Sequence, residues 1–283
     1  MTTTPAARTG RKPNRAWVIA RTDLRQLRKS RDFWIPLAVV AVLFFVVIPA
    51  LLLLVVVGLN DVQVIHKLSG VIGTLPKAIR QHVKGNRPEV ETAYALSVYL
   101  FAPLAIIVPL TISSAVGSHT IIGERERGSG EFLSHSPATE SEIYTGKLMA
   151  SLIPGYVTAL LGFGLYSLVV NLIVGPKVGG WFFPTASWWL LVLWVLPPFI
   201  ALAVCLILAI SARVSSAAAA QQASALVTLP LMLIAFSVAS GSMYKAGYIG
   251  VVIGTLAWLG ALTALWRGAH SVTRERLLGI GGG

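Results

Sequence analysis

Residues 33–60 read FWIPLAVVAVLFFVVIPALLLLVVVGLN, and this stretch contains no Asp, Glu, Lys or Arg. A helix that crosses about 30 Å of hydrocarbon needs about 20 consecutive apolar residues, because each residue advances it by about 1.5 Å. The stretch is long enough for one crossing and too short for two crossings with a turn. It predicts a membrane-spanning helix over residues 34–59.

The rest of the chain contains further uncharged stretches of similar length. Together they predict six spans, at about residues 34–59, 94–119, 148–174, 188–211, 222–243 and 247–266. Charged residues make up 12% of the chain and hydrophobic residues 55%, whereas a soluble domain carries about 25% charged residues. The predicted fold class is therefore an all-α polytopic membrane protein with six transmembrane helices, since a helix satisfies its own backbone hydrogen bonds in lipid.

The distribution of Lys and Arg predicts the orientation in the membrane. With the N-terminus inside, the cytoplasmic segments carry 16 Lys and Arg residues in total, and the outer segments carry 7. Because basic loops stay on the cytoplasmic side, both termini are expected in the cytoplasm. The net charge of +12 is then explained by basic loops on the cytoplasmic face that contact lipid headgroups, and nucleic acid is not an expected partner.

The N-terminal region divides into two parts. Residues 1–14 are rich in Thr, Pro and Arg and are predicted to be disordered. In residues 15–33, the apolar residues Trp17, Ala20, Leu24 and Leu27 recur at spacings of 3 and 4, and basic residues lie between them. This pattern predicts a basic amphipathic helix in the inner headgroup plane, the alternative being a solvated charged lead-in. Residues 34–266 are the predicted transmembrane domain, and residues 267–283 a cytoplasmic tail.

The loop between the second and third spans, residues 122–147, carries an unusual share of the acidic residues of the chain. Pro137 predicts a turn within it. Thr139 and Ser141 are suited to cap the helix that follows, with Glu140 and Glu142 at its positive end. Such a charged segment between two spans suits the docking of a soluble partner, and its simpler interpretation is a solvated connection.

Prolines and glycines within the spans predict local breaks and close contacts. Proline removes a backbone hydrogen bond from a helix and can bend its axis. We interpret these prolines as packing features in preference to hinges: Pro103, Pro109, Pro197, Pro198 and Pro230. Gly250 and Gly254 fit the spacing of small residues that lets two membrane helices approach closely.

Several kinds of chemistry have no residues to support them. No acidic or basic residue lies in a core span, so a proton relay through the bilayer lacks carriers. Gly123 and Gly128 have the spacing of a phosphate-binding loop, but the Lys-Ser/Thr pair that must follow is missing. We expect no catalytic, cofactor-binding or metal-binding residue in this chain. Energy for uphill transport would therefore have to come from another chain.

The 122–147 loop also resembles a known family. Its characteristic segments are Gly123-Glu124-Arg125-Glu126-Arg127-Gly128, then Glu131-Phe132-Leu133, Ser136-Pro137, Glu142-Ile143 and Gly146-Lys147-Leu148. This order resembles the type-2 ATP-binding-cassette (ABC) exporter permeases. The likeness extends over most of the chain, through the basic lead-in, the six-span layout and the Ser/Ala-rich loop after the fourth span.

The resemblance implies a homodimer or heterodimer of permease subunits with two cytoplasmic ABC ATPase subunits, which bind the ATP and Mg. Residues 15–33 would be the elbow helix, and residues 120–147 would carry the coupling helix that contacts the ATPase. The expected ATPase-coupling residues are Glu124, Arg125, Glu126, Arg127, Gly128, Glu131, Glu142 and Lys147. A second cytoplasmic loop would contribute Arg213, Ser215 and Ser216.

Two features depart from the family pattern. Gly130 stands where a bulkier residue is expected, which weakens the predicted helix there. The connection between the fifth and sixth spans, residues 244–247, is short, so the outer hairpin of larger relatives would be small or missing.

The sequence, together with this resemblance, therefore predicts a permease subunit of an ATP-driven exporter in a bacterial plasma (inner) membrane, with membrane lipid around it. Its uncharged spans favour an amphipathic, lipid-like, drug-like or peptide cargo. One alternative is an ATP-independent membrane scaffold or assembly protein that docks a soluble partner. A further alternative is a secondary carrier.

Overall fold

The computed structural model describes residues 14–58, 83–126, 136–211, 219, 222, 225–226, 228–230 and 248–271. Every regular element among these residues is helical. Helix α1 comprises Arg15–Lys29, and the first span is built from α2 (Arg31–Val42), η1 (Leu43–Val47) and α3 (Ile48–Gly58). The second span is α6 (Pro88–Ala95), η2 (Leu96–Leu100) and α7 (Leu104–Glu126), and the third is α9 (Glu140–Ile173). The short α10 (Gly175–Val178) is followed by α11 (Ala186–Leu190), η3 (Leu191–Val195) and α12 (Leu196–Ser211), and the last helix is α14 (Tyr248–Ser271).

Five helical stretches in the described part of the chain are long and apolar enough to cross a membrane. They are Trp34–Gly58, Pro88–Thr120, Glu140–Ile173, Ala186–Ile210 and Gly250–His270. Each overlaps a predicted span, which confirms the all-α polytopic membrane fold. The predicted span over residues 222–243 falls largely outside the described residues, so the number of six stays a prediction.

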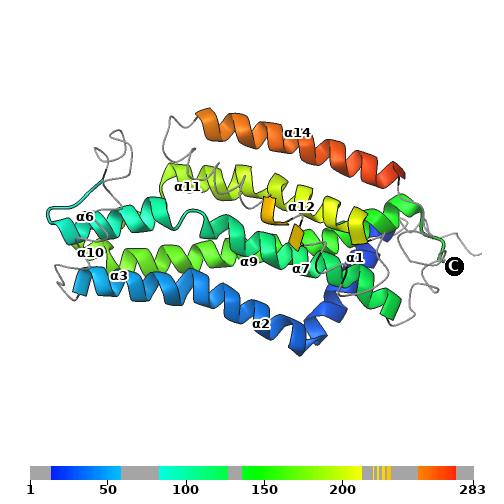
Figure 1. Ribbon diagram of the computed structural model, residues 1–283, viewed down its shortest axis with the longest axis horizontal. Coiled ribbons are helices and arrows are strands. Elements are labelled where there is room, and N and C mark those ends of the chain that lie inside the picture. The colour runs from blue at the N-terminus through cyan, green and yellow to red at the C-terminus, as the bar shows by residue number, and fades with distance from the viewer. Residues whose placement is uncertain are drawn as a thin grey trace, which may run out of the picture.

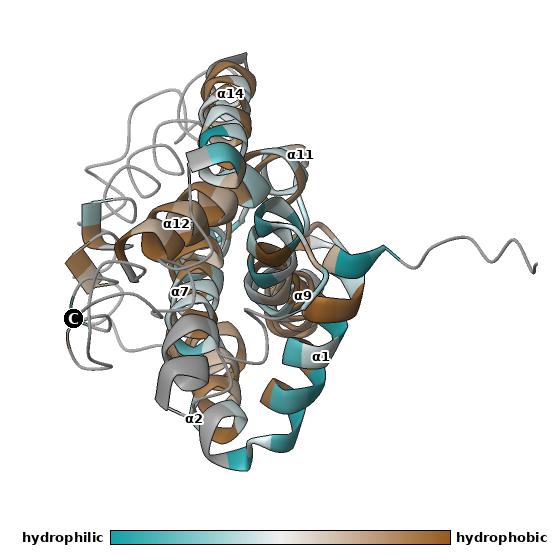
Figure 2. Cartoon of the chain, turned by 90° about the vertical axis from the view of Figure 1, so that its right-hand side faces the viewer, coloured by the Kyte–Doolittle hydropathy of each residue, from teal (hydrophilic) through white to brown (hydrophobic). Residues whose placement is uncertain are grey.

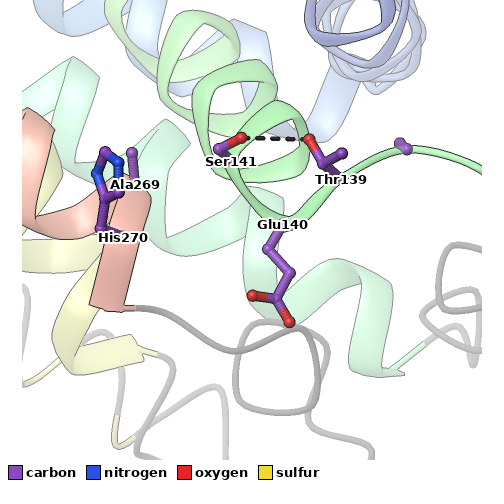
Figure 3. Close-up of a pocket in the computed structure, with 6 residues that line it drawn as sticks. Thr139, Glu140, Ser141, Ala269 and His270 are labelled. Carbon is purple, nitrogen blue, oxygen red and sulfur yellow. Dashed lines mark hydrogen bonds between the residues drawn. The ribbon is translucent and has the colours of Figure 1, made fainter.

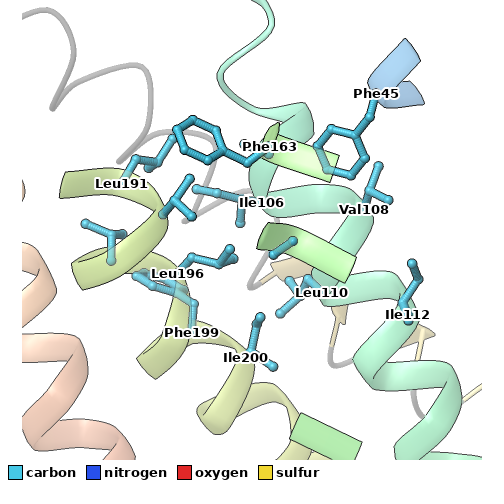
Figure 4. Packing of buried hydrophobic residues seen from close by; sticks show 14 of the residues in the cluster. Phe45, Ile106, Val108, Leu110, Ile112, Phe163, Leu191, Leu196, Phe199 and Ile200 are labelled. Atoms are coloured by element: carbon cyan, nitrogen blue, oxygen red, sulfur yellow. The ribbon is translucent and has the colours of Figure 1, made fainter. Parts of the chain in front are cut away.

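The helices form an elongated bundle in which α7 and α12 are central (Figure 1). The most apolar parts of the second and fourth spans are 72% and 67% buried, whereas those of the first and last spans are each 22% buried. Helices α2 and α3 lie at one edge and α14 at the other (Figure 1). The core between them is filled by branched and aromatic side chains, as Figure 4 shows for Ile106 and Leu110 of α7 and Leu196 and Ile200 of α12.

Three of the spans contain a π-helical segment, and each segment lies just before a proline. These segments are η1 before Pro49, η2 before Pro103 and η3 before Pro197 and Pro198. Because proline has no N–H, the carbonyl four residues earlier loses its α-helical donor, and the chain shifts to bonds five residues apart. The Phe101 N–H, for example, donates to the Leu96 carbonyl at 3.1 Å.

The predicted interruption at Pro103 is confirmed, since the helix stops between Leu100 and Leu104. Pro109, in contrast, lies within the continuous helix α7. Aromatic donors from neighbouring helices reach the carbonyls beside the break. The Tyr166 hydroxyl donates to the Ser97 carbonyl at 2.6 Å, and Trp188 Nε1 donates to the Val98 carbonyl at 2.8 Å. The break is therefore tied to both α9 and α11.

Helix α1 runs across the bundle and not along it. In Figure 2 the spanning helices are seen roughly end-on, whereas α1 extends across the view from beside α9 toward α2. The helix ends at Lys29, and α2 begins after Ser30, so the predicted segment 15–33 contains a break. Ala20 and Leu27 of the predicted apolar stripe are buried, but Trp17 of the same stripe is 46% exposed. Part of the apolar stripe therefore packs against the bundle, and part of it is exposed on the surface.

Candidate functional site

The end of the bundle that holds α1, the end of α7 and the start of α9 contains those predicted coupling residues that the structure describes. Glu124, Arg125 and Glu126 form the last turn of α7, although their side chains lie outside the described part of the structure. The remaining loop positions lie outside the described residues altogether, namely Arg127, Gly128, Glu131, Arg213, Ser215 and Ser216. The side chains of Glu142 and Lys147 are described, and each has a defined partner.

Glu142 organises the first turn of α9. The Glu142 N–H donates to Thr139 Oγ1 at 3.3 Å, and the Glu142 carboxylate accepts from the Thr139 N–H at 2.8 Å. This reciprocal capping box satisfies two backbone donors that a helix start leaves free. Of the two predicted caps, Thr139 is confirmed, whereas Ser141 lies inside the first turn of the helix. The carboxylate of Glu142 therefore fixes where α9 begins.

Arg15 connects α1 to the segment that precedes α9. Its guanidinium donates to the backbone carbonyl of Pro137, a residue 122 positions further along the chain. The predicted turn at Pro137 is thus held from the side by the first residue of α1. Sequence reasoning did not select Arg15, because nothing local distinguishes it from the other arginines of the helix.

A glycine lets α1 lie directly on α9. A Cβ atom at Gly146 would lie 2.8 Å from Cβ of Ile19 and 2.9 Å from the backbone carbonyl oxygen of Ala16. Real Cβ atoms do not approach other atoms so closely, so any larger residue at this position would push the two helices apart. The Gly146 of the family-like motif is therefore explained by contact with α1.

Lys147 lies inside the bundle. Its side chain is fully buried, and Nζ donates to the Thr120 carbonyl of α7 at 3.2 Å. A buried ammonium needs such acceptors, because the interior does not solvate it. The residue was predicted among those that couple to an ATPase. Within this chain its contact is with α7, which joins the end of the second span to the start of the third.

Tyr144 extends the same contacts to the other helices. Its hydroxyl is a hydrogen-bond partner of the Cys205 thiol in α12. The ring also lies against Gly268 of α14, where a Cβ atom would overlap the tyrosine. The sequence contains no signal for this role, since it depends on how α12 and α14 are rotated against α9. The first two turns of α9 thus contact α1, α7, α12 and α14.

A pocket of about 530 Å³ opens beside this junction. It lies between the start of α9 and the end of α14 and is lined by Ala138, Thr139, Glu140, Ser141, Ala269 and His270. Figure 3 shows the lining of the pocket, with the Glu140 carboxylate, the hydroxyl groups of Thr139 and Ser141, and the His270 ring. The hydroxyl oxygens of Thr139 and Ser141 are 3.2 Å apart. A polar pocket that offers both hydrogen-bond donors and hydrogen-bond acceptors is suited to bind a partner surface.

Comparison with protein families agrees with this arrangement. A family model described as ABC-2 family transporter protein matches residues 17–254. The match begins within α1, includes the whole α7–α9 junction and continues into α14. A comparison with curated proteins gives no match. The chain therefore belongs to the ABC-2 transporter family, as a multi-pass membrane permease subunit.

Proposed function

We propose that this permease is driven by separate cytoplasmic ATPase subunits that dock at the junction of α1, α7 and α9. One observation carries the proposal: the start of α9 and the segment before it are each bonded to a neighbouring helix. Arg15 of α1 holds the Pro137 carbonyl, and Lys147 of α9 holds the Thr120 carbonyl of α7. A displacement of the loop is therefore transmitted to three helices at once, as interface-driven switching requires.

Within this proposal the predicted coupling residues have two roles. Glu124, Arg125 and Glu126 extend from the end of α7 toward the loop that continues with Arg127, Gly128 and Glu131, and these residues meet the ATPase. Glu142 and Lys147 act through the chain itself, since one caps α9 and the other binds α7. A second contact is made by the loop with Arg213, Ser215 and Ser216. ATP and Mg are bound by the partner subunits.

The proposed cargo is amphipathic, in the range of lipids, drugs or peptides, and the direction is export. Hydroxyl groups in the described spans support this choice, because many bond to the carbonyl one turn earlier in their own helix. Examples are Ser97 to Ala93, Ser114 to Leu110 and Ser151 to Lys147. Side chains satisfied in this way leave walls that are largely apolar, which suits a cargo with a hydrocarbon part.

The functional unit is proposed to contain a second permease subunit, identical or related, in a bacterial plasma membrane. Large apolar side chains on the outer faces of the bundle support both lipid and subunit contact, among them Leu51, Leu161, Leu172, Leu256 and Leu259. In this proposal both termini are in the cytoplasm, on the side where the ATPases dock. In this orientation α1 lies on the cytoplasmic face of the membrane.

Co-purification with an ABC ATPase tests the proposal. The double variant Glu126→Ala and Arg127→Ala is expected to reduce the retained ATPase, or to separate ATP hydrolysis from transport in proteoliposomes. The matched control is Arg87→Ala with Glu89→Ala, which also removes one acid and one base. Arg87 Nη1 and Glu89 Oε1 are 3.9 Å apart and lie at the opposite end of the bundle. Their substitution is expected to leave coupling intact.

Three results would count against the proposal. Unchanged coupling in the Glu126 and Arg127 double variant would show that the loop is not the transmission element. A purified chain that binds a soluble partner without stimulating any ATPase activity would favour the scaffold alternative. Transport that survives ATP depletion but stops with the proton gradient would instead indicate a secondary carrier.

A further inference from the structure

Helix α1 has two sides with different surroundings. At about 100° per residue, Trp17 lies about 160° from Arg15 around the helix, so the two residues point in nearly opposite directions. Arg15 holds the Pro137 carbonyl of the segment before α9. The side that carries Trp17 continues, at spacings of 4, 3 and 4, through Arg21, Leu24 and Arg28. We name these four residues the α1 line.

The α1 line is accessible and cationic. Trp17 is 46% exposed, Arg21 and Arg28 are exposed, and Leu24 is half-buried. The acidic residue of α1, Asp23, is buried on the side that faces the bundle. The outer surface of α1 therefore combines guanidinium groups with apolar side chains and presents no carboxylate of its own.

This combination fits the headgroup region of an anionic lipid leaflet. Guanidinium groups donate two parallel hydrogen bonds to phosphate, and tryptophan is enriched at the headgroup level of membranes. The helix also runs across the bundle axis, as Figure 2 shows, which places it along a membrane surface. An acidic protein or a nucleic acid would use the arginines but would leave Trp17 and Leu24 without apolar contacts.

The contacts of α1 carry a change at this line to the start of α9. Ala16 and Ile19 lie against Gly146 so closely that the helices have no room to slide independently. Arg15 adds the bond to Pro137, two residues before the capping threonine. A restraint on α1 is therefore also a restraint on the entrance to α9.

We propose that anionic phospholipid headgroups bound along the α1 line regulate coupling, by holding the 136–147 segment in the position that an ATPase engages. This inference rests on the proposed function, and it adds a regulator and its binding site. Neutral lipid would leave α1 less restrained, and ATP hydrolysis would then drive less transport.

The test uses the full chain with its ATPase partner in proteoliposomes of phosphatidylcholine, with and without phosphatidylglycerol. Phosphatidylglycerol is expected to raise transport per ATP hydrolysed. Arg21→Gln with Arg28→Gln is expected to abolish this rise and to weaken phosphatidylglycerol binding about 25-fold, since each basic residue contributes about 1 kcal/mol, or about fivefold. Binding is followed by the thermal shift of the detergent-purified protein on lipid addition.

Three further variants separate the explanations. Arg25→Gln with Lys29→Gln removes the same charge from the neighbouring exposed side of α1 and is expected to keep most of the response. Arg21→Lys with Arg28→Lys keeps the charge and is expected to retain part of the response to phosphatidylglycerol. That result would exclude misfolding as the cause of the loss in the Gln double variant. Arg15→Gln is expected to bind phosphatidylglycerol normally but to lose the rise in transport, because it breaks the connection to Pro137.

The outcomes distinguish this inference from the function on which it rests. ATP-driven transport that is equal in the two lipid mixtures would overturn the regulatory role and leave the proposed function standing. Equal losses in the two Gln double variants would overturn the assignment to the α1 line. Absence of ATP-driven transport in both lipid mixtures would instead contradict the proposed function.

Discussion

Small residues set the distances between the helices of this bundle. Gly155 of α9 lies under Ser113 of α7, where an added Cβ atom would come within 2.8 Å of the Ser113 Cβ and within 3.2 Å of the Pro109 carbonyl oxygen. Gly254, half of the predicted small-residue pair in α14, lies against the Trp194 ring in a similar way. Without a hydrophobic driving force between helices in lipid, such close packing supplies much of their association.

The Gly155→Ala variant tests this point. The new methyl group overlaps Ser113, so α7 and α9 must separate, and we expect a loss of about 1–3 kcal/mol of stability, measured by thermal unfolding in detergent. Gly164→Ala in the same helix is the matched control, because no atom lies within 4 Å of its added Cβ. It is expected to be neutral or slightly stabilising, since alanine favours the helix.

A compensating change sharpens the interpretation. Ser113→Gly combined with Gly155→Ala removes the overlapping side chain and is expected to recover most of the lost stability. Equal stability losses in the Gly155 and Gly164 variants would show that the α7–α9 contact does not depend on this glycine.

At the scale of the helix, proline and aromatic donors work together. Pro198 has no N–H to offer the Trp194 carbonyl, and Trp258 Nε1 of α14 donates to that carbonyl at 3.1 Å. Tyr166 and Trp188 donate to the Ser97 and Val98 carbonyls, which lie beside the break before Pro103. Neighbouring helices thus satisfy backbone groups that would otherwise remain unpaired in lipid. This supports the interpretation of these prolines as packing features.

Trp258→Phe tests the pairing between α12 and α14. The variant keeps an aromatic ring but loses the N–H, and we expect it to lower stability by about 0.5–1.5 kcal/mol in thermal unfolding. In a Pro198→Ala background the backbone N–H returns and can serve the Trp194 carbonyl, so the same change is expected to cost less. An equal cost in both backgrounds would contradict a role for Pro198 in freeing that carbonyl.

On the scale of the whole molecule, the two ends of the bundle differ. One end holds α1, the capping box and the 530 Å³ pocket. The other holds Arg87, Glu89 and Lys177 around a second pocket of about 540 Å³. Because α9 has 34 residues, these ends lie about 50 Å apart, enough to place them on opposite sides of a membrane.

Cysteine labelling of intact cells tests the orientation. Lys177→Cys is expected to react with a membrane-impermeant maleimide from outside, whereas Glu140→Cys is expected to react only after permeabilisation. Both positions are exposed, and the natural Cys205 is buried, which keeps the background labelling low. The reverse pattern would place the α1 end outside the cell and would exclude cytoplasmic ATPases at that end.

The sequence alone determined the membrane class, the approximate limits of the described spans and the presence of a hydroxyl cap near Thr139 at the start of α9. These features are local, because they depend on the length of an apolar run or on residues within one helical turn. The sequence also carried the family motif from Gly123 to Lys147. The residues of that motif could be identified from the sequence, but the contacts of most of them could not.

Only the tertiary structure decided that Lys147 is buried on Thr120, that Gly146 makes room for Ala16, and that Arg15 reaches Pro137. Each of these contacts depends on how one helix is rotated and shifted against another. In a soluble helix the polar face would indicate that rotation, but a helix in lipid is apolar on both its packed and its outer faces. The rotation is therefore set by the fit of small and large side chains between helices, which becomes visible only once the bundle is assembled.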